Sequence, residues 1–306
     1  MWSKIYKYFS KDMLGLVSQG AGFCGIKCSY PKDYNDPYEL FLGVDLNVST
    51  DSLAFYKDVI QELPQLPTTC FSNSPTVSPM WAHYAQNHSG FVLEFDVDRL
   101  ESNFEEISVR EVKYKDEPDD SIAEFLGRAV VTKKPRHAHF LQQAVLSEAY
   151  FTKHTSWDYE QECRLVDFGN YTEDVAGNKI LYVPIECVSA LIVGSNFSEG
   201  ENAASVEAAE NNGLEWYKAV IGRTSPVPFF MDNSGEAFIF DGEKVSQPPS
   251  KCDHCSEPLA DNGKLCAWCS ITEEQQYNMA STNPFRILDH YGLLDDYFDN
   301  LPGKRS

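Results

Sequence analysis

The pattern of apolar and polar positions predicts a body that mixes strands and helices. Apolar residues that alternate, as at Phe91, Leu93 and Phe95, predict strands, and apolar residues three and four positions apart predict helices. We expect strands at residues 4–9, 23–28, 90–95, 163–168, 180–185, 190–193 and 214–221, and helices at residues 121–131, 136–150 and 199–212. A helical turn that ends at Gly20 should follow the first strand, and Gly213 fits a left-handed helix cap. Residues 1–245 therefore read as one α+β body.

The chain changes character after this body. The run Ser246-Gln247-Pro248-Pro249-Ser250 is typical of a linker, which we place at residues 246–251. A cysteine-rich segment follows at residues 252–271, and a helical tail occupies residues 272–306.

The tail carries clear helix-start signals. Thr272 and Gln275 have the spacing of a capping box, and Asn283-Pro284 combines a cap residue with proline in the first turn. The tail also has an apolar face, which must dock on the body or on an unknown protein partner: Phe285, Ile287, Leu288, Tyr291, Leu294, Tyr297 and Phe298.

The charge balance limits the partners. The chain of 306 residues has 46 acidic and 25 basic side chains and a formal net charge of −21. Bulk charge of this sign repels phosphate backbones and anionic membranes unless positive charge is gathered locally, but it permits a small anionic ligand in a local pocket. No apolar run approaches the ~18 residues of a membrane span, and the start lacks a signal-peptide core. We therefore expect a soluble, cytoplasmic protein.

Nine cysteines are present, and they fall into two groups. Four are clustered with metal-ligand spacing, and five are scattered: Cys24, Cys28, Cys70, Cys163 and Cys187. An odd remainder without a secretion signal indicates reduced thiols in a reducing compartment. We expect Cys24 and Cys28 to be buried as small apolar residues.

The clustered cysteines predict a zinc ribbon. Cys252-x2-Cys255 and Cys266-x2-Cys269 form two knuckles, and the Asn262-Gly263 pair between them is a hairpin signal. Two knuckles complete the tetrahedral sulfur shell that zinc prefers, although four thiolates also suit iron or a redox site. Four protein ligands leave no open position, so the zinc should be structural. His254 should not be a ligand.

Three stretches of the body occur together. They are Asn35-Asp36-Pro37-Tyr38-Glu39, then Cys70-Phe71-Ser72 with Met80-Trp81-Ala82-His83-Tyr84-Ala85, and finally Trp157-x2-Glu160-x-Glu162-x-Arg164. In this order they resemble domain-of-unknown-function family 2971, over about residues 4–195. Tyr38 stands where that family usually has phenylalanine. The family name implies no activity.

The order of elements is also similar to that of ADP-ribosyltransferase-type domains. The resemblance implies a fold of that type, with NAD contacts at Lys7 and Tyr8 on the first strand, at Ser72 on a middle strand, and a late Glu160-x-Glu162 pair. It implies Glu162 as the carboxylate that stabilises the transition state and Glu160 as the one that orients the acceptor. Lys7 replaces the usual arginine or histidine, and no Thr-Ser pair follows Ser72. A toxin or anti-phage defence effector is one role this implies.

The glutamate pair also has a physical interpretation. If residues 160–165 form a strand, Glu160, Glu162 and Arg164 share one face, and Cys163 and Leu165 share the other. Two stacked carboxylates need a cation between them, or the pKa of one is raised, and Arg164 would neutralise one of them. The alternative is a charge-paired face of an edge strand.

Two aromatic residues are candidate ligand contacts. Trp81 and Tyr84 are i, i+3 neighbours in a predicted helix, where they either stack on a flat ring such as nicotinamide or belong to the core. The leading hypothesis is an enzyme that uses NAD. The alternatives are a metal-dependent nuclease or phosphodiesterase with Glu160, Glu162 and Asp36 as ligands, and a non-enzymatic interaction module.

Overall fold

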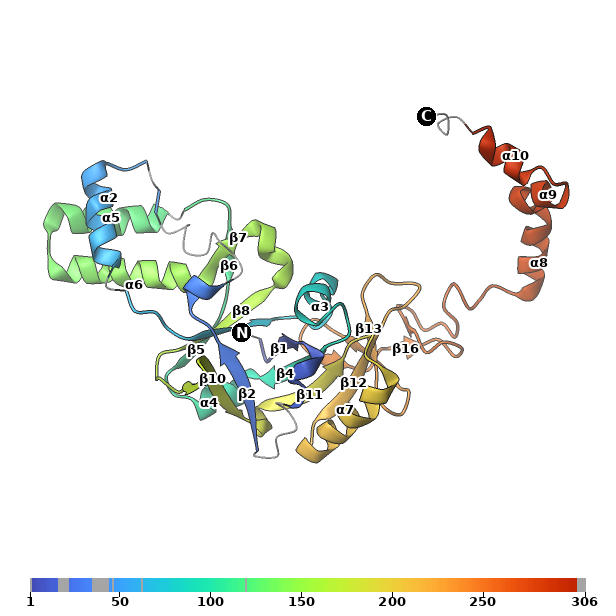
Figure 1. Ribbon diagram of the computed structural model, residues 1–306, viewed down its shortest axis with the longest axis horizontal. Coiled ribbons are helices and arrows are strands. Elements are labelled where there is room, and N and C mark those ends of the chain that lie inside the picture. Colours follow the sequence, from blue (N-terminus) through green and yellow to red (C-terminus); the bar gives the residue numbers. More distant parts are fainter. Residues whose placement is uncertain are drawn as a thin grey trace. The chain divides into compact units, whose positions relative to one another are not determined.

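The computed structural model describes residues 2–15, 22–34, 44–45, 47–61, 63–118 and 120–301 (Figure 1). The predicted cap at Gly20 and the Asn35–Glu39 motif lie outside these residues. Contacts divide the chain into two units. The first, Met1–Ile221 with Val227–Ser246, is called the body here, and the second, Gly222–Pro226 with Gln247–Ser306, is called the C-terminal unit.

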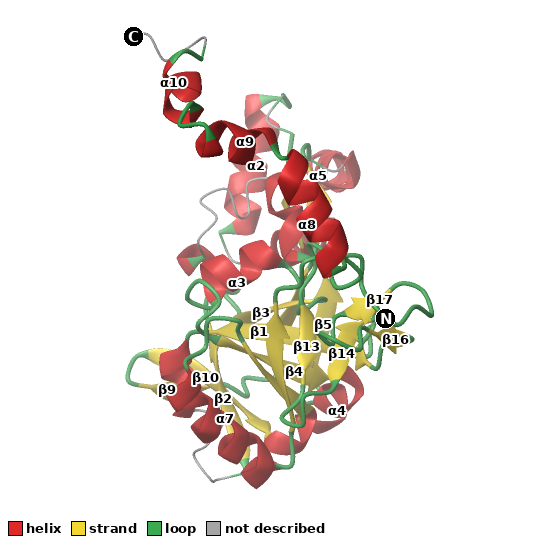
Figure 2. Ribbon diagram, turned by 90° about the vertical axis from the view of Figure 1, so that its right-hand side faces the viewer, coloured by secondary structure: helices red, strands yellow, loops and turns green. Residues whose placement is uncertain are grey.

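A curled sheet forms the centre of the body (Figure 2). Its strand order is β15-β14-β13-β12-β11-β4-β1-β3-β8-β5. The bounds of these strands are β1 Lys4–Phe9, β3 Thr68–Ser72, β4 Phe91–Asp96, β5 Ile107–Glu111, β8 Glu162–Asp167, β11 Val188–Val193, β12 Glu215–Val220, β13 Phe229–Met231, β14 Ala237–Phe240 and β15 Val245–Ser246. A second sheet pairs β2 Phe23–Cys28, β10 Asn178–Pro184 and β9 Glu173–Val175, and a two-stranded one pairs β6 Lys113–Lys115 with β7 Thr152–His154.

Both faces of the large sheet are covered. Ile5 and Phe9 of β1 pack in one apolar cluster, whereas Tyr6 and Tyr8 pack in the other, because successive strand side chains point to opposite faces. Figure 2 shows the strands between helix α3, Ser78–Tyr84, on one side and helices α4, Val97–Asn103, and α7, Glu199–Asn212, on the other. This explains why the central strand β4 is buried at almost every position.

Three helices form a separate apolar cluster in the body. These are α2 Thr50–Ile60, α5 Asp120–Thr132 and α6 Pro135–Phe151 (Figure 1), which bury Ile122, Leu126, Leu141 and Val145. Helix α2 was not predicted. The short 3-10 helices of the body are η1 Lys11–Met13, η2 Pro31–Asp33, η4 Thr155–Glu160 and η5 Ile185–Cys187.

The C-terminal unit contains a hairpin of β16 Ser250–Lys251 and β17 Pro258–Leu259, followed by helices α8 Glu273–Thr282, α9 Pro284–His290 and α10 Leu294–Asp299. The predicted capping box is present, since Thr272 caps α8 and Gln275 reaches back to it. Asn283 caps α9 as predicted. In the body, Gly213 ends α7 in the left-handed conformation, also as predicted.

The mixed α/β class is confirmed, but one local prediction is wrong. Glu160 is not on the strand: it ends the 3-10 helix η4, and Gln161 then turns through a left-handed conformation with φ 46° before β8 begins at Glu162. Strand alternation therefore relates Glu162 to Arg164 but not to Glu160. Among the described residues, no helix is both long enough and apolar enough to cross a membrane.

Two glycines give a paired test of the packing. A Cβ added to Gly90 would lie 2.1 Å from the Phe9 carbonyl oxygen and 2.9 Å from Ala85 Cα, whereas one added to Gly127 in α5 meets nothing within 4 Å. We expect Gly90→Ala to lower the free energy of unfolding by about 1–3 kcal/mol. Gly127→Ala should raise it by about 0.5–1 kcal/mol, because alanine is the better helix former. Urea unfolding checks both, and equal effects of the two substitutions would contradict this account.

Candidate functional site

The large sheet is weakly joined between β1 and β3. Strand β1 pairs with β4 along its whole length, and β3 pairs with β8 from Thr68 to Ser72, but β1 and β3 share the single register pair Tyr6↔Ser72. The two strands therefore diverge on either side of this pair. The Lys7 side chain bridges the divergence, with its Nζ donating to the Cys70 carbonyl oxygen at 2.9 Å.

A cavity of about 260 Å³ lies at this divergence. It is lined from the large sheet, the second sheet, α3, β7 and η4, so distant parts of the sequence meet there. Of the predicted site residues, the cavity brings together Lys7, Tyr8, Ser72, Tyr84, Glu160, Glu162 and Arg164. The lining residues that were not predicted include Lys27, Asp33, Tyr34, Lys153 and Trp157.

A buried ion network forms one wall of the cavity. Arg164 donates from Nε to Glu162 Oε1 at 2.7 Å and from Nη2 to Glu162 Oε2 at 3.1 Å. Lys153 Nζ lies between the two carboxylates, 2.5 Å from Glu160 Oε2 and 3.1 Å from Glu162 Oε2. The Tyr84 hydroxyl donates to the other Glu160 oxygen, Oε1, at 2.7 Å. The cation that two adjacent carboxylates require is thus Lys153 together with Arg164.

The network shifts the acidity of its members. Burial acts to raise the pKa of Glu162, but the charges of Arg164 and Lys153 outweigh it and hold the pKa at about 2. Burial would lower the pKa of Lys153, yet Glu162 and Glu160 raise it above its ordinary value. Burial and then the bond to Glu160 raise the pKa of Tyr84. The repulsion between the two carboxylates was expected to raise the pKa of one of them. The pKa of Glu162 is instead lowered, because the attraction of Arg164 and Lys153 is stronger than this repulsion.

Two further lysines, Lys7 and Lys27, line the cavity. Burial lowers the pKa of Lys7, and the neighbouring Cys70, Cys28 and Glu162 oppose this shift. The cavity is lined by the basic residues Lys7, Lys27, Lys153 and Arg164 and the acidic residues Asp33, Glu160 and Glu162, so the described lining has four positive and three negative side chains. This is a local positive balance in a chain of net charge −21. A small anionic ligand is therefore compatible with the cavity.

The two aromatic residues predicted as ligand contacts, Trp81 and Tyr84, lie in different environments. Tyr84 lines the cavity, but Trp81 is fully buried, donates its indole N–H to the Pro75 carbonyl oxygen at 2.8 Å and packs edge-on against Tyr8. Trp81 is therefore a core residue, and its prediction as a ligand contact is wrong. Trp157 takes a comparable place in the lining, with Lys153 Nζ 4.7 Å from the centre of its ring.

Residues 80–165 match the family DUF2971, described as a protein of unknown function. This segment is similar to the DUF2971 family. The match begins at Met80, in α3, and ends at Leu165, in β8, so the DUF2971 segment includes Tyr84, Lys153, Glu160, Glu162 and Arg164. The Asn35–Glu39 and Cys70–Ser72 motifs lie outside it. No curated protein and no solved structure matches the chain significantly.

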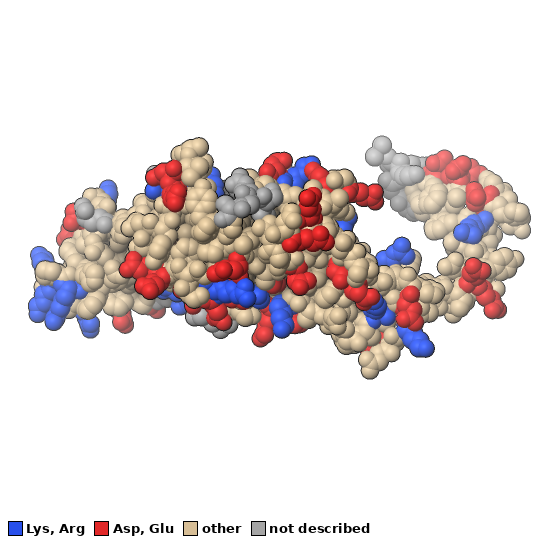
Figure 3. Space-filling view, turned by 90° about the horizontal axis from the view of Figure 1, so that it is seen from below, with Lys and Arg blue, Asp and Glu red and all other residues tan. Residues whose placement is uncertain are grey.

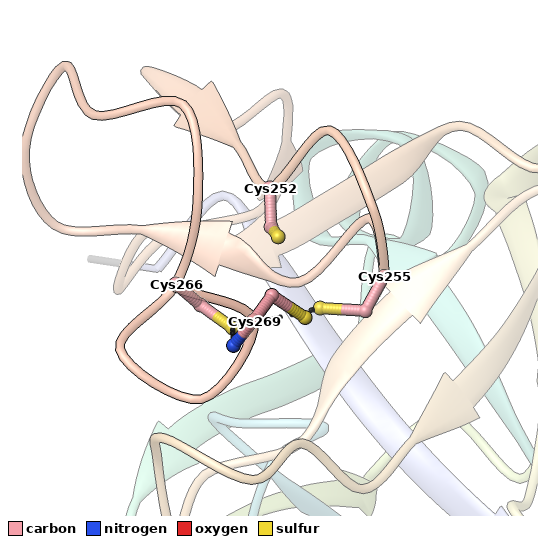
Figure 4. Close-up of side chains that lie close together, drawn as sticks. All are labelled: Cys252, Cys255, Cys266 and Cys269. Atoms are coloured by element: carbon pink, nitrogen blue, oxygen red, sulfur yellow. Dashed lines mark hydrogen bonds between the residues drawn. The ribbon is translucent and has the colours of Figure 1, made fainter. Parts of the chain in front are cut away.

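The four clustered cysteines converge in the C-terminal unit (Figure 4). The sulfur atoms of Cys252, Cys255, Cys266 and Cys269 all lie within 4.8 Å of one another, and Cys255 Sγ is 3.8 Å from Cys266 Sγ. Zinc–sulfur bonds of about 2.3 Å in a tetrahedron place the sulfur atoms about 3.8 Å apart. The donor set therefore fits a structural zinc ion, held by these four thiolates without an open coordination position.

Backbone hydrogen bonds shape both knuckles. The amide of Cys269 donates to Cys266 Sγ at 3.3 Å, and the amide of Ser256 donates to the Cys252 carbonyl oxygen at 2.9 Å. The hairpin prediction needs a correction. Strands β16 and β17 flank the first knuckle, and Asn262-Gly263 instead belongs to a turn in which Gly263 N donates to the Asp261 carboxylate.

A further buried carboxylate organises the C-terminal unit. Glu257 Oε1 accepts from the amides of Arg223 and Thr224 at 2.8 Å each and from the Thr224 hydroxyl at 2.7 Å. These bonds fix the segment Gly222–Pro226 to the first knuckle. Nothing in the local sequence around Glu257 signals this role, because its partners lie more than thirty positions away.

Zinc content provides the first test of the site. The pure protein should contain one zinc per chain, because four thiolates complete the shell. Cys266→Ser should lower the zinc content and increase proteolysis within residues 250–306 while the body stays folded. Elemental analysis and limited proteolysis measure these effects, with Cys187→Ser, a buried cysteine outside the cluster, as the control. A wild-type protein with far less than one zinc and four freely titratable thiols would refute the ribbon.

The ion network predicts a pH-dependent stability. Glu162→Gln removes the bidentate partner of fully buried Arg164 and should lower the free energy of unfolding at neutral pH by about 3–5 kcal/mol. The folded pKa of about 2 lies below the unfolded value of ~4.3, so this contribution is complete above pH ~4.3 and disappears as the pH falls toward 2. The difference between wild type and variant should therefore narrow over this interval. Exposed Glu215→Gln is the control, and a pH-independent difference would contradict the account.

Proposed function

We propose that the body binds NAD in the cavity between β1 and β3 and acts as an ADP-ribosyltransferase-like enzyme. The observation that supports this most is the meeting around one cavity of Lys7 from β1, Ser72 from β3, and the carboxylates of Glu160 at the end of η4 and Glu162 at the start of β8. These residues occur in the same order along the chain as the basic, serine and glutamate positions of ADP-ribosyltransferase-type domains. The serine-bearing strand β3 lies between the other two strands.

The cavity suits one half of a dinucleotide. Pockets that enclose a whole drug-sized ligand measure about 300–1,000 Å³, and this cavity measures about 260 Å³. The nicotinamide ribose would occupy it, with the ring against Tyr84 or Trp157, and the rest of NAD would lie outside. Lys7 and Lys27 would supply positive charge for the anionic part of the ligand.

The geometry favours Glu160 as the carboxylate that acts on the ribose, which reverses the roles expected from the sequence. Both oxygens of Glu162 accept bonds from Arg164, and one also faces Lys153, so its charge is neutralised within the protein. Among the residues that the structure describes, Glu160 has one cation partner, Lys153, and one neutral partner, Tyr84. Glu162 and Arg164 then serve as positioning residues, because they hold Lys153 and through it Glu160.

The proposed step breaks the bond between nicotinamide nitrogen and ribose C1′. Nicotinamide leaves with the bonding electron pair, and positive charge develops on the ribose ring. Glu160 stabilises this charge, an interaction that matters in the transition state more than in the bound substrate. An acceptor nucleophile or water then bonds to C1′ and releases its proton. NAD is therefore a substrate here, and its products are nicotinamide and ADP-ribose, which is linked to the acceptor or, where water attacks, free.

One observation favours a second, non-enzymatic function for the C-terminal unit. Its helices expose large apolar side chains, among them Tyr277 at 76% and Tyr291 at 70%. Surfaces of this kind are common at protein interfaces. The metal-dependent nuclease hypothesis gains no comparable support: among the described residues, the cysteine quartet is the group whose ligand atoms converge, and Asp36 lies outside those residues.

NAD binding and turnover test the proposal. Calorimetry should detect NAD binding to the wild-type protein, and chromatography should detect released nicotinamide when protein or nucleic-acid acceptors are present. Glu160→Gln should lower turnover by about 10²–10³-fold with little change in NAD affinity, because the carboxylate acts on the transition state. Tyr84→Phe, which keeps the ring and removes one bond to Glu160, should have a smaller effect.

The exposed Glu215→Gln variant is the matched control and should turn over NAD like the wild type. Circular dichroism must show that each variant is folded before turnover is compared. A wild-type protein that neither binds nor consumes NAD overturns the transferase proposal. Magnesium- or manganese-dependent cleavage of a nucleic acid by the same preparation would favour the nuclease alternative.

A further inference from the structure

The turn between α5 and α6 carries a concentration of positive charge. Lys133, Lys134 and Arg136 fall within four positions, followed by His137 and His139. No aspartate or glutamate occurs between Glu124 and Glu148, although the whole chain has 46 acidic against 25 basic residues. In Figure 3, lysine and arginine side chains gather over the left-hand part of the body, which these helices form. This group of residues is called the basic tip here.

The backbone presents these side chains outward. Lys133 directly follows α5 and has a left-handed conformation with φ 49°. Lys134 is the N-cap residue of α6, which begins at Pro135. Lys133, Lys134 and Arg136 are all exposed, and none forms an ion pair with another described residue. His137 Nδ1 lies 2.5 Å from the Thr132 hydroxyl, a contact that joins the two helices across the turn.

Along the sequence of the α5–α6 hairpin, the acidic residues that come first on either side of the turn are Glu124 and Glu148. Glu148 lies twelve positions along α6 from Arg136, about 18 Å at 1.5 Å per residue, and it is paired with Lys115 at 2.7 Å. Glu124 is nine positions from Lys133, about 13 Å along α5. The packed helix α2 contributes Asp51, Asp58 and Lys57. Physiological salt screens charges over about 8 Å, so Glu124 and Glu148 are too far along their helices to neutralise the tip.

The fold explains only part of this charge. The macrodipole of α5 favours Lys133 at its C-terminal end, but Arg136 in the first turn of α6 opposes the macrodipole of that helix, and the cations repel one another. The apolar cluster of the three helices is formed by residues such as Ile122, Leu126 and Leu141, to which the exposed lysines add nothing. Burial, followed by the positive charges of Arg136, Arg128 and Lys134, lowers the pKa of His137 and favours its neutral form.

Exposed ring surface accompanies the charge. Phe140 is 50% exposed, and it follows Arg136 by four positions, so the two side chains share one face of α6. His139 lies beside it with ring centroids 6.4 Å apart. Phosphate-binding cations next to an exposed aromatic ring are the features by which proteins hold single strands, since unpaired bases stack on such rings. An acidic protein surface could also pair with these cations, but its carboxylates would not stack on the Phe140 ring as bases do.

We propose that the basic tip, Lys133, Lys134 and Arg136 with His139 and Phe140, is a binding surface for single-stranded nucleic acid. The cations contact phosphates, and Phe140 stacks on a base. Single strands are preferred to duplexes because only unpaired bases can stack on the ring. This surface does not depend on NAD chemistry, and it stands or falls independently of the proposed transferase activity.

Fluorescence anisotropy with a labelled single strand of about 20 nucleotides tests this proposal. For three phosphate contacts, the slope of log K against log salt should be about −2, and Lys133→Gln, Lys134→Gln and Arg136→Gln together should bring it close to zero. Phe140→Ala should weaken binding to the single strand by about tenfold, within the range of one lost stacking contact, and leave the salt slope unchanged.

The control protein carries Lys113→Gln, Lys244→Gln and Lys264→Gln, which remove the same charge from exposed sites outside the three-helix cluster. It should bind like the wild type. A duplex of the same sequence and polyglutamate are the competing probes, and both should bind more weakly than the single strand. Equal losses in both triple variants, tighter binding of polyglutamate, or no binding at about 50 mM salt would overturn the proposal.

Discussion

Lys153 occupies the position on which the centre of the body depends. Its buried ammonium group lies between the carboxylates of Glu160 and Glu162. Arg164 supplies the second positive charge, so the two carboxylates and the two cations together carry no net charge. Removing charges from water is costly, and only complete pairing with good geometry offsets the penalty. The pairing also ties together β7, η4 and β8, which supply Lys153, Glu160 and the Glu162–Arg164 pair. A conformational change in any of these elements would leave a charge without its partner.

The strand β8 carries apolar residues on one face and the charged pair on the other. Strand β8 directs Cys163 and Leu165 into the apolar cluster on one face and Glu162 and Arg164 toward the cavity on the other. Its neighbour β3 pairs with it over five residues but meets β1 only at Tyr6↔Ser72. The polar face therefore lies beside the place where the sheet separates. Strand β8 thus packs in the core with one face and lines the cavity with the other.

The sequence supports those predictions that depend on local periodicity or spacing. The strand at Phe91–Phe95, the cap at Gly213 and the cysteine quartet need only a few neighbouring residues. Lys153 was not predicted, because its carboxylate partners are brought near by the left-handed turn at Gln161, which no residue pattern signals. Helix α2 was missed for a related reason: Phe55 and Val59 face a cluster formed by α5 and α6, far along the chain. Trp81 was assigned to a ligand because burial of an aromatic residue depends on tertiary contacts.

The C-terminal unit consists of two separate stretches of chain, and this determines where the protein can be cut without disrupting a structural unit. The segment Gly222–Pro226 leaves the body after β12 and belongs with the ribbon, since Glu257 binds the amides of Arg223 and Thr224. The chain then returns to form β13, β14 and β15 before it enters the ribbon itself. A gene fusion or deletion with a junction at residue 246 would thus cut through one structural unit. A ribbon expressed from residue 247 onward would lack the Arg223 and Thr224 amides that Glu257 binds.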